Sequence, residues 1–249
     1  MKKTALLILS LVLSAHLFSQ VINIEGKRFL RDTNGFTGKT DLSFSLNQNI
    51  NQVMILGTNI HAQYKYNKHR ILSISDLLFM KADQKDFVNA GYAHLRYNYK
   101  IAPPIVTWEA FIQAQYNLIL LLDRRYLAGT GPRFRVYKTQ QIRLYMAALY
   151  MYEYQSQARE TIQSYNHRLS NYLTLTLDLN RIDFTSTTFY QPKLDEWSDF
   201  RIANDTSLEF ELSQRLNIRA GLNLLYDTRQ PPGVPPLTYL LKNALSLKF

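Results

Sequence analysis

The segment that decides the fold is Val53–Asn67, which reads VMILGTNIHAQYKYN. Apolar and polar side chains alternate along it, with Met54, Leu56, Ile60, Tyr64 and Tyr66 at even positions and Asn59, His61, Gln63 and Lys65 at odd positions. Successive side chains of a β-strand point to opposite faces, whereas a helix repeats its apolar residues every three or four positions. The pattern therefore predicts a long strand with one apolar face and one polar face.

The same alternation recurs from Gly35 to the end of the chain, in segments of about 9 to 15 residues. Phe87–Lys100 and Leu169–Leu179 are clear examples, and short polar or proline-bearing connectors separate the segments. About eleven connectors imply about twelve strands, and an even number returns both ends of the chain to the periplasmic side. We expect residues 35–249 to be all-β, forming a transmembrane antiparallel up-and-down β-barrel with periplasmic termini.

The N-terminal residues indicate export. Lys2 and Lys3 precede an apolar run that is too short to span a bilayer, and Ser19 supplies a small residue at a cleavage point, with Ala15 as a weaker alternative. We expect residues 1–19 to be a secretory signal peptide and residues 20–34 to be an N-terminal periplasmic segment. The chain has no cysteine, so an exported fold must be stabilised without disulfides.

The last predicted strand, Thr238–Phe249, alternates in the same way and ends on a phenylalanine. A C-terminal Phe249 on an amphipathic strand resembles the assembly signal that the barrel assembly machinery reads. The alternative is a strand of a soluble periplasmic sandwich that happens to end in phenylalanine. Together with the signal peptide, the repeated alternation favours the cell outer membrane as the location, with outer-membrane lipid and the barrel assembly machinery as partners.

The charge balance raises nucleic acid or anionic lipid as further partners, because 29 Lys and Arg face 19 Asp and Glu, giving a net charge of +10. The basic residues are scattered singly, and an exported protein does not meet nucleic acid. We therefore predict no nucleic-acid partner and a monomer.

Aromatic residues on the apolar faces fall near the predicted strand ends, as in the two aromatic girdles of a membrane barrel. The predicted periplasmic girdle contains Tyr64, Tyr66, Tyr97, Tyr99 and Trp108, and the outer one Tyr150, Tyr152, Tyr190, Trp197, Tyr226 and Tyr239.

Two residues fit the predicted strand pattern poorly. Pro132 cannot donate a ladder hydrogen bond, so we expect a bulge or local break there, and Asp76 lands on the nominal lipid face, so we expect a bulge or register shift to turn it inward.

Two segments carry a family resemblance: Arg125–Phe134 (RYLAGTGPRF), and Leu225–Asp227 followed by two prolines and a closing strand. They resemble the YdiY-like salt-induced outer-membrane protein family, a domain family of unknown function, over nearly all of the mature chain. The chain departs from the family's pattern where Gln48 and Asn49 replace a Gly-Asn turn and where Pro132 interrupts a glycine pair. The resemblance implies an outer-membrane barrel linked to envelope or osmotic conditions, with no catalytic residues to transfer.

The polar faces carry many ionisable residues, which would line the lumen. We single out as a candidate charge network Arg96, Glu109, Arg133, Arg135, Arg143, Glu209, Glu211 and Arg219. Arg96 and Glu109 lie at matching distances from a predicted turn, and Glu209 or Glu211 can meet Arg219. One interpretation is a salt-bridge network that stiffens the wall, in a structural or envelope-stress role. The other is a narrow pore whose excess of arginine favours anionic or polar solutes.

An enzyme is the alternative from another class. Ser73 or Ser75 could face His94 across a predicted hairpin, which would suit an outer-membrane lipid hydrolase, although a catalytic pair also needs an orienting partner and an oxyanion site. The remaining histidines are scattered without ligand spacing, and no phosphate-binding loop follows Gly129-Thr130-Gly131. We therefore predict a non-enzymatic protein without catalytic residues, metal or cofactor.

Overall fold

The computed structural model describes residues 34–48, 52–82, 85–117, 122–157, 163–213, 216–230 and 235–248. These residues form a closed antiparallel barrel in which each strand pairs with its neighbours in sequence and β1 pairs with β12. The strands are β1 (Gly35–Gln48), β2 (Gln52–Tyr66), β3 (His69–Ala82), β4 (Lys85–Ala102), β5 (Val106–Asn117), β6 (Leu122–Lys138), β7 (Ile142–Gln157), β8 (Gln163–Leu179), β9 (Ile182–Pro192), β10 (Phe200–Glu211), β11 (Leu216–Asp227) and β12 (Leu237–Lys248). The predicted fold class, an all-β antiparallel up-and-down barrel, is confirmed.

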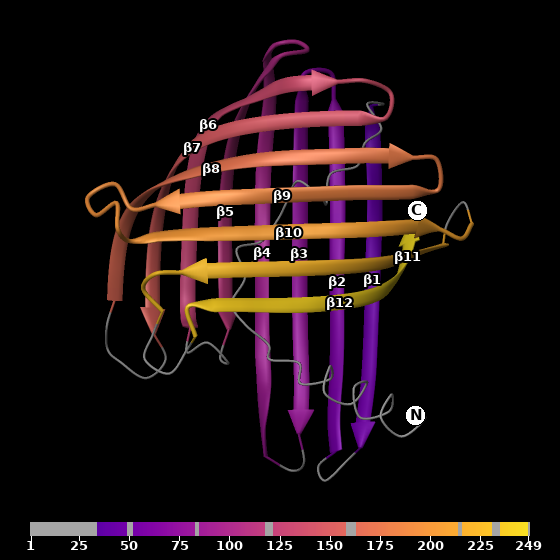
Figure 1. Cartoon of the computed structure of the whole chain (residues 1–249), viewed down its shortest axis with the longest axis vertical. Helices are drawn as coiled ribbons and strands as arrows, with labels where there is room; N and C mark the ends of the chain where they lie inside the picture. Colours follow the sequence, from indigo (N-terminus) through magenta and orange to yellow (C-terminus); the bar gives the residue numbers. More distant parts are fainter. Residues whose placement is uncertain are drawn as a thin grey trace, which may run out of the picture.

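The strands of one wall, β1–β4, cross those of the other wall, β8–β12, when the barrel is viewed from the side (Figure 1). Strands that tilt strongly against the barrel axis produce this crossing. Within the described residues, no helix is long and apolar enough to cross a membrane.

Alternation in the sequence becomes alternation between lumen and outer surface. In β2, His61 and Gln63 are buried inside the barrel, while Tyr64 is 51% exposed on the outside. In β4, Arg96 is buried inside and Tyr97 is exposed outside. The exposed outer residues are mostly Leu, Ile, Tyr and Phe, so the outer surface is the face that lipid would cover.

Asp76 faces inward as expected, but no bulge turns it: the register shift of β3 against β4 lies farther along, between Met80 and Ala82. The β2–β3 register runs through the pair Asn59 and Asp76 without a shift, and Asn59 Nδ2 donates a hydrogen bond to Asp76 Oδ2 over 2.9 Å. Asp76 shares its face with Leu72 (0% exposed) and Ile74 (1% exposed), which lie inside the barrel. Both faces of β3 are apolar in sequence, so alternation alone assigned the lipid face to the wrong set of residues.

At Pro132 the structure has the predicted local break. The β6–β7 ladder skips Gly131 and Pro132, yet it keeps the same register on either side, at Thr130 and at Arg133. A Cβ added to Gly131 would contact the Ala148 carbonyl oxygen and lie 2.7 Å from the Leu149 Cα atom, so the two backbones approach closely where proline donates no hydrogen bond.

The two ends of the barrel differ in their connectors. Residues 67–68, 103–105, 139–141 and 180–181 form short turns at one end, which we call the short-turn mouth, and β1 begins and β12 ends there. The opposite end, the long-loop mouth, includes the longer connector 193–199. Exposed aromatic residues occur towards both mouths, with Tyr66 and Trp108 near the first and Tyr152 and Trp197 near the second.

The β1–β12 junction that closes the barrel is short. Its register covers Lys39–Leu42 against Leu245–Lys248, whereas β1 pairs with β2 from Gly35 to Gln48. The predicted signal peptide, the predicted periplasmic segment apart from Asn34, and Phe249 lie outside the described residues.

Candidate functional site

The carboxylate of Glu109 on β5 lies close to arginines from both neighbouring strands. Glu109 is 0% exposed, and its Oε2 atom lies 2.8 Å from Arg96 Nη1 on β4. Its other oxygen lies 3.8 Å from Arg133 Nε on β6. The register places Glu109 opposite Asn98 and Gly131, and therefore diagonal to both arginines, within reach of their long side chains.

The same carboxylate is also contacted from across the lumen. Tyr172 on β8 donates a hydrogen bond from its hydroxyl to Glu109 Oε2 over 2.7 Å, although β6 and β7 separate β8 from β5 in the sheet. The guanidinium of Arg96 lies 5.3 Å from the centre of the Phe111 ring, over which His94 stacks. We call Arg96, Glu109, Arg133 and Tyr172 the Glu109 cluster; it narrows the lumen and ties together strands that are not neighbours.

A second buried carboxylate, Glu153 on β7, lies towards the long-loop mouth and is 0% exposed. Its oxygens lie 2.5 Å from Arg201 Nη1, 3.5 Å from Arg168 Nε and 3.9 Å from Arg125 Nε. Arg201 lies on β10, so this contact also passes over two strands. These four residues form the Glu153 cluster.

Two further acids balance the charge of the Glu153 cluster. Asp227 accepts a hydrogen bond from Arg201 over 2.7 Å, and Asp199 accepts one from Arg168 over 2.8 Å. Three arginines thus meet three carboxylates, and the region is formally neutral. In the low dielectric of a buried site such a network is stable only with its partners in place, because removing one partner leaves an unpaired charge.

A third group of ion pairs passes over β12. Lys39 Nζ on β1 lies 2.5 Å from Glu209 Oε2 on β10, and Arg219 Nη1 on β11 lies 3.4 Å from Asp41 Oδ2 on β1. The register places Glu209 opposite Arg219, as the sequence suggested, but the ion pairs that the structure shows for both residues reach β1 instead. Glu211 is exposed, and no ion pair joins it to another described residue.

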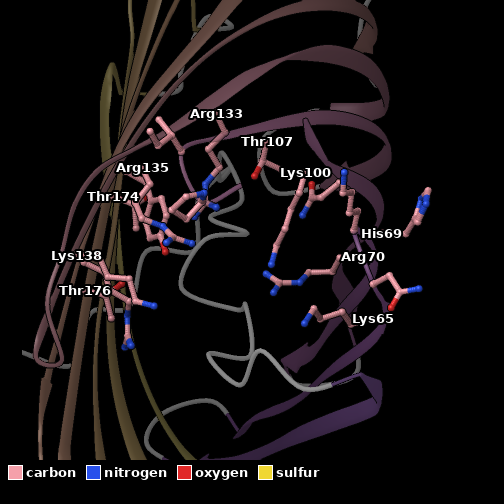
Figure 2. A pocket seen from close by; sticks show the side chains of 17 residues that line it. Lys65, His69, Arg70, Lys100, Thr107, Arg133, Arg135, Lys138, Thr174 and Thr176 are labelled. Atoms are coloured by element: carbon pink, nitrogen blue, oxygen red, sulfur yellow. The ribbon is translucent and has the colours of Figure 1, made fainter. Parts of the chain in front are cut away.

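The inner side of the short-turn mouth holds a cavity of about 960 Å³, counting the part that is open to solvent. Eight of its 17 lining residues are basic, and we call them the cationic vestibule: Lys65, Lys68, Arg70, Lys100, Arg133, Arg135, Lys138 and Arg143. Among the described residues that line the cavity, none is acidic. The side chains come from two facing walls, Lys65, Arg70 and Lys100 on one side and Arg133, Arg135 and Lys138 on the other (Figure 2).

A smaller cavity of about 420 Å³ lies deeper in the barrel and is lined by residues of both clusters, including Arg96, Arg125, Glu153 and Arg201. The lumen therefore contains space on the mouth side of the clusters and between them. Charge differs along it, because the vestibule is basic while the Glu153 cluster is balanced by acids.

The structure divides the predicted network into separate groups. Arg96, Glu109 and Arg133 come together, and Arg133, Arg135 and Arg143 line the same cavity. Glu209 and Arg219 belong to the pairs near the β1–β12 junction, and Glu211 joins no group. The network missed several residues that the structure places in ion pairs, among them Lys39, Asp41, Arg125, Glu153, Arg168, Asp178, Asp199, Arg201 and Asp227. Except for Asp199, which lies in the connector before β10, their positions on the polar faces of the strands could have included them.

The structure does not fit the alternative of a serine and histidine pair. His94 lies opposite Ile74, is 2% exposed inside the barrel and shares a hydrogen bond of 2.9 Å with Gln113. Ser73 lies opposite Leu95 on the outer face, and Ser75 shares its side of the strand. Adjacent positions of a strand point to opposite faces, so neither serine can reach the ring. In the part of the chain that the structure describes, no group of His, Asp and Glu is placed to hold a metal ion.

Residues 33–249 match the family model described as "Protein of unknown function, DUF481". The chain belongs to this family. The resemblance drawn from Arg125–Phe134 is consistent with that membership. In the comparison with curated proteins, none matched this DUF481 chain.

Solved structures of other barrels are similar to this DUF481 protein. The translocator domain of the autotransporter NalP from Neisseria meningitidis is 8% identical, with a TM-score of 0.51 over 88% of this chain and 89% of that chain. The KdgM porin is 10% identical, with a TM-score of 0.49 over 86% and 99% of the two chains. The NanC porin is 11% identical, with a TM-score of 0.48 over 85% and 97%. The NalP likeness supports the membrane-barrel fold and nothing about activity.

Proposed function

We propose that this protein is a non-enzymatic barrel of the outer membrane that acts as a narrow pore favouring anionic solutes. The observation that supports the proposal is the cationic vestibule, where eight basic side chains surround one cavity and no described lining residue is acidic. Fixed charges around a passage select ions by sign, because they raise the local concentration of the opposite charge.

The two buried clusters set the width of the passage in this proposal. Tyr172 and Arg201 reach across the lumen to Glu109 and Glu153, so side chains occupy space that a wide pore would leave to water. Small ions and small solutes would pass through the cavities beside the clusters. The clusters, being held by charge-assisted hydrogen bonds, would keep this width constant.

The location and partners are part of the same proposal. The outer face, rich in exposed Leu, Ile and Tyr side chains, suits outer-membrane lipid, with aromatic residues such as Trp108 and Trp197 towards the two mouths. Delivery would depend on the barrel assembly machinery, and the barrel would act as a monomer without a nucleic-acid partner.

The test is the conductance of the refolded protein in a planar bilayer with a KCl gradient. We expect small stepwise currents and a reversal potential of the sign that chloride permeation gives. The double variant Arg135→Gln with Lys138→Gln should move the reversal potential towards zero. Arg181→Gln is the matched control, because Arg181 is an exposed turn residue at the same mouth and does not line the cavity. A silent bilayer, or cation preference in the unchanged protein, would refute the pore.

A structural role in the envelope is the second candidate, and the contacts that cross the lumen favour it. Glu109 and Glu153 join strands that the backbone ladder leaves apart, which would stiffen the wall whether or not ions pass. Silence in the bilayer together with a strong loss of stability after substitution of Glu153 would support this role alone.

A further inference from the structure

A β-bulge in β6 directs a lysine side chain into the cationic vestibule. The register against β7 shifts between Arg135 and Tyr137, so β6 contains one extra residue there. Val136 (54% exposed) and Tyr137 (52% exposed) are consecutive and both lie on the outside. Without the extra residue, alternation would point Lys138 outward, whereas Arg135 and Lys138 both line the cavity. The bulge thus places two basic side chains of one strand on the same wall.

The neighbouring strands complete this wall. In the ladders, Lys138 lies opposite Arg143 of β7, and Arg143 lies opposite Thr176 of β8. Directly opposite side chains of a sheet have Cβ atoms about 5 Å apart. Thr176 also lines the cavity, on the same side of it as Arg135 and Lys138 (Figure 2). We call these four residues the bulge wall: Arg135, Lys138, Arg143 and Thr176.

The guanidinium groups of the bulge wall have hydrogen-bonding capacity that the described residues do not use. The Nε atom of Arg135 and the Nε and Nη2 atoms of Arg143 are buried and have no hydrogen-bond partner among these residues. Asp178 Oδ2 lies 3.9 Å from Arg143 Nη2, which is beyond hydrogen-bonding distance. Like charges directly opposite each other also destabilise a sheet, and Lys138 and Arg143 form such a pair. An oxyanion bound at this wall would lower both costs.

The turn beside the bulge wall is held in position by its own hydrogen bonds. The backbone N–H of Ile142 donates to Thr139 Oγ1 over 2.9 Å, and the N–H of Thr139 donates to the Ile142 carbonyl oxygen over 2.8 Å. The N–H of Asp178 donates to the Gln141 carbonyl oxygen over 2.8 Å, which ties β8 to the turn. Lys138 directly precedes this turn, so the backbone of the site loses little conformational freedom when a ligand binds.

We infer that the bulge wall binds one soluble oxyanion of the phosphate or sulfate class. Donors on three neighbouring strands can reach several oxygen atoms of one such anion, and a guanidinium fork matches the spacing of two of its oxygens. A halide offers no such pair of acceptors, so the site favours the oxyanion. The inference rests on the proposed function and deepens it, because it names the class of solute that the pore would take up at its short-turn mouth.

Titration calorimetry on the full barrel refolded in detergent tests the site, with orthophosphate as the probe at constant ionic strength. We expect phosphate to bind at least about tenfold more tightly than chloride, which is added as a competitor. Sulfate should displace phosphate, because it presents the same arrangement of oxygen atoms. Phosphate that binds no more tightly than chloride, or that does not bind, would overturn the inference.

Variants show whether the anion binds at the bulge wall. Arg143→Gln should weaken phosphate binding about tenfold or more, since it removes a guanidinium group with open hydrogen-bonding positions. Lys138→Gln removes the charge that the bulge directs inward and should weaken binding about threefold or more. Arg181→Gln is the matched control and should leave binding unchanged, because Arg181 is an exposed turn residue at the same mouth and does not line the cavity. An equal loss in Arg143→Gln and Arg181→Gln would show attraction by net charge alone and would overturn the site.

Arg143→Lys separates an oxyanion site from a general positive charge. Lysine keeps the charge but lacks the planar fork, so phosphate affinity should fall about threefold or more at unchanged net charge. Each variant is first checked for folding by its heat-modifiable mobility in electrophoresis. Full phosphate affinity in folded Arg143→Lys would overturn the role of the fork and with it the preference for an oxyanion.

The outcomes separate this inference from the pore. Binding in detergent does not require conduction, so phosphate binding by a barrel that is silent in the bilayer would overturn the pore and keep the site. Anion-selective current without phosphate or sulfate binding would keep the pore and overturn the site.

Discussion

Replacing Glu153 by glutamine should destabilise the barrel more than any other single loss of charge at the long-loop mouth. Glutamine keeps nearly the same shape and one acceptor oxygen, but it removes the negative charge that three arginines share. The distances to Arg201, Arg168 and Arg125 are 2.5, 3.5 and 3.9 Å. After the substitution, Asp199 and Asp227 alone would balance three guanidinium groups in a buried site.

The magnitude follows from the free energy of folding that is lost when a buried charge loses its partner. Breaking a buried ion pair from one side typically costs 3–5 kcal/mol, and Glu153 is 0% exposed with three cationic neighbours. The two remaining acids and the retained amide oxygen of glutamine reduce the loss, so we expect about 3 kcal/mol. With a urea slope of about 2 kcal/mol per molar, the unfolding midpoint should fall by about 1.5 M.

Urea unfolding from lipid vesicles, followed by tryptophan fluorescence, measures this midpoint, and Trp108 on the outer face is a suitable reporter. Glu211→Gln is the matched control, because Glu211 is exposed and forms no ion pair with another described residue; its effect should stay below about 0.5 kcal/mol. If Glu153→Gln and Glu211→Gln unfold at the same urea concentration, the buried network does not stabilise the barrel and the reasoning fails.

Three further substitutions test other parts of the fold. Tyr172→Phe removes the hydrogen bond that crosses the lumen and should cost about 1 kcal/mol in the same urea titration; an unchanged midpoint would contradict that contact. Gly131→Ala should cost about 1–3 kcal/mol and lower the refolding yield, since the added Cβ would clash with the Ala148 carbonyl oxygen, and normal refolding would argue against the close approach. At the long-loop mouth, a hydrogen bond from Arg229 lowers the pKa of Glu196, so this pair is present above the ordinary carboxyl pKa and is lost as the pH falls through the lowered value. Trypsin should therefore cleave after Arg229 faster in Glu196→Gln at neutral pH, and equal rates would show that the pair does not order the loops.

Alternating polarity predicted most of the fold because neighbouring residues of a strand face the polar lumen and the apolar outer surface in turn. β2 and β4 alternate clearly in sequence, and their polar residues, such as Gln63 and Arg96, do face inward. β3 shows where this signal fails. Leu72 and Ile74 of β3 point into the barrel, where other side chains partly fill the lumen. This strand therefore carries apolar residues on both faces, and polarity alone does not tell which face points inward.

The candidate site was predictable only for contacts within a hairpin. Arg96 and Glu109 lie on consecutive strands at matching distances from one turn, so the sequence can place them together. The contact between Glu153 and Arg201 passes over two strands, and it depends on the curvature and the stagger of the closed barrel. Neither quantity is encoded in the local alternation of any one segment.

The short β1–β12 junction determines where the barrel would open sideways into the bilayer. Elsewhere a gap between strands would expose long rows of backbone groups to hydrocarbon, but here the ladder of the described residues covers only Lys39–Leu42. Lys39 and Asp41 in this stretch also bind Glu209 and Arg219 beyond β12, so lateral opening must break two ion pairs as well as the ladder. Resistance to lateral opening at this junction thus depends on these two buried ion pairs as well as on the short ladder.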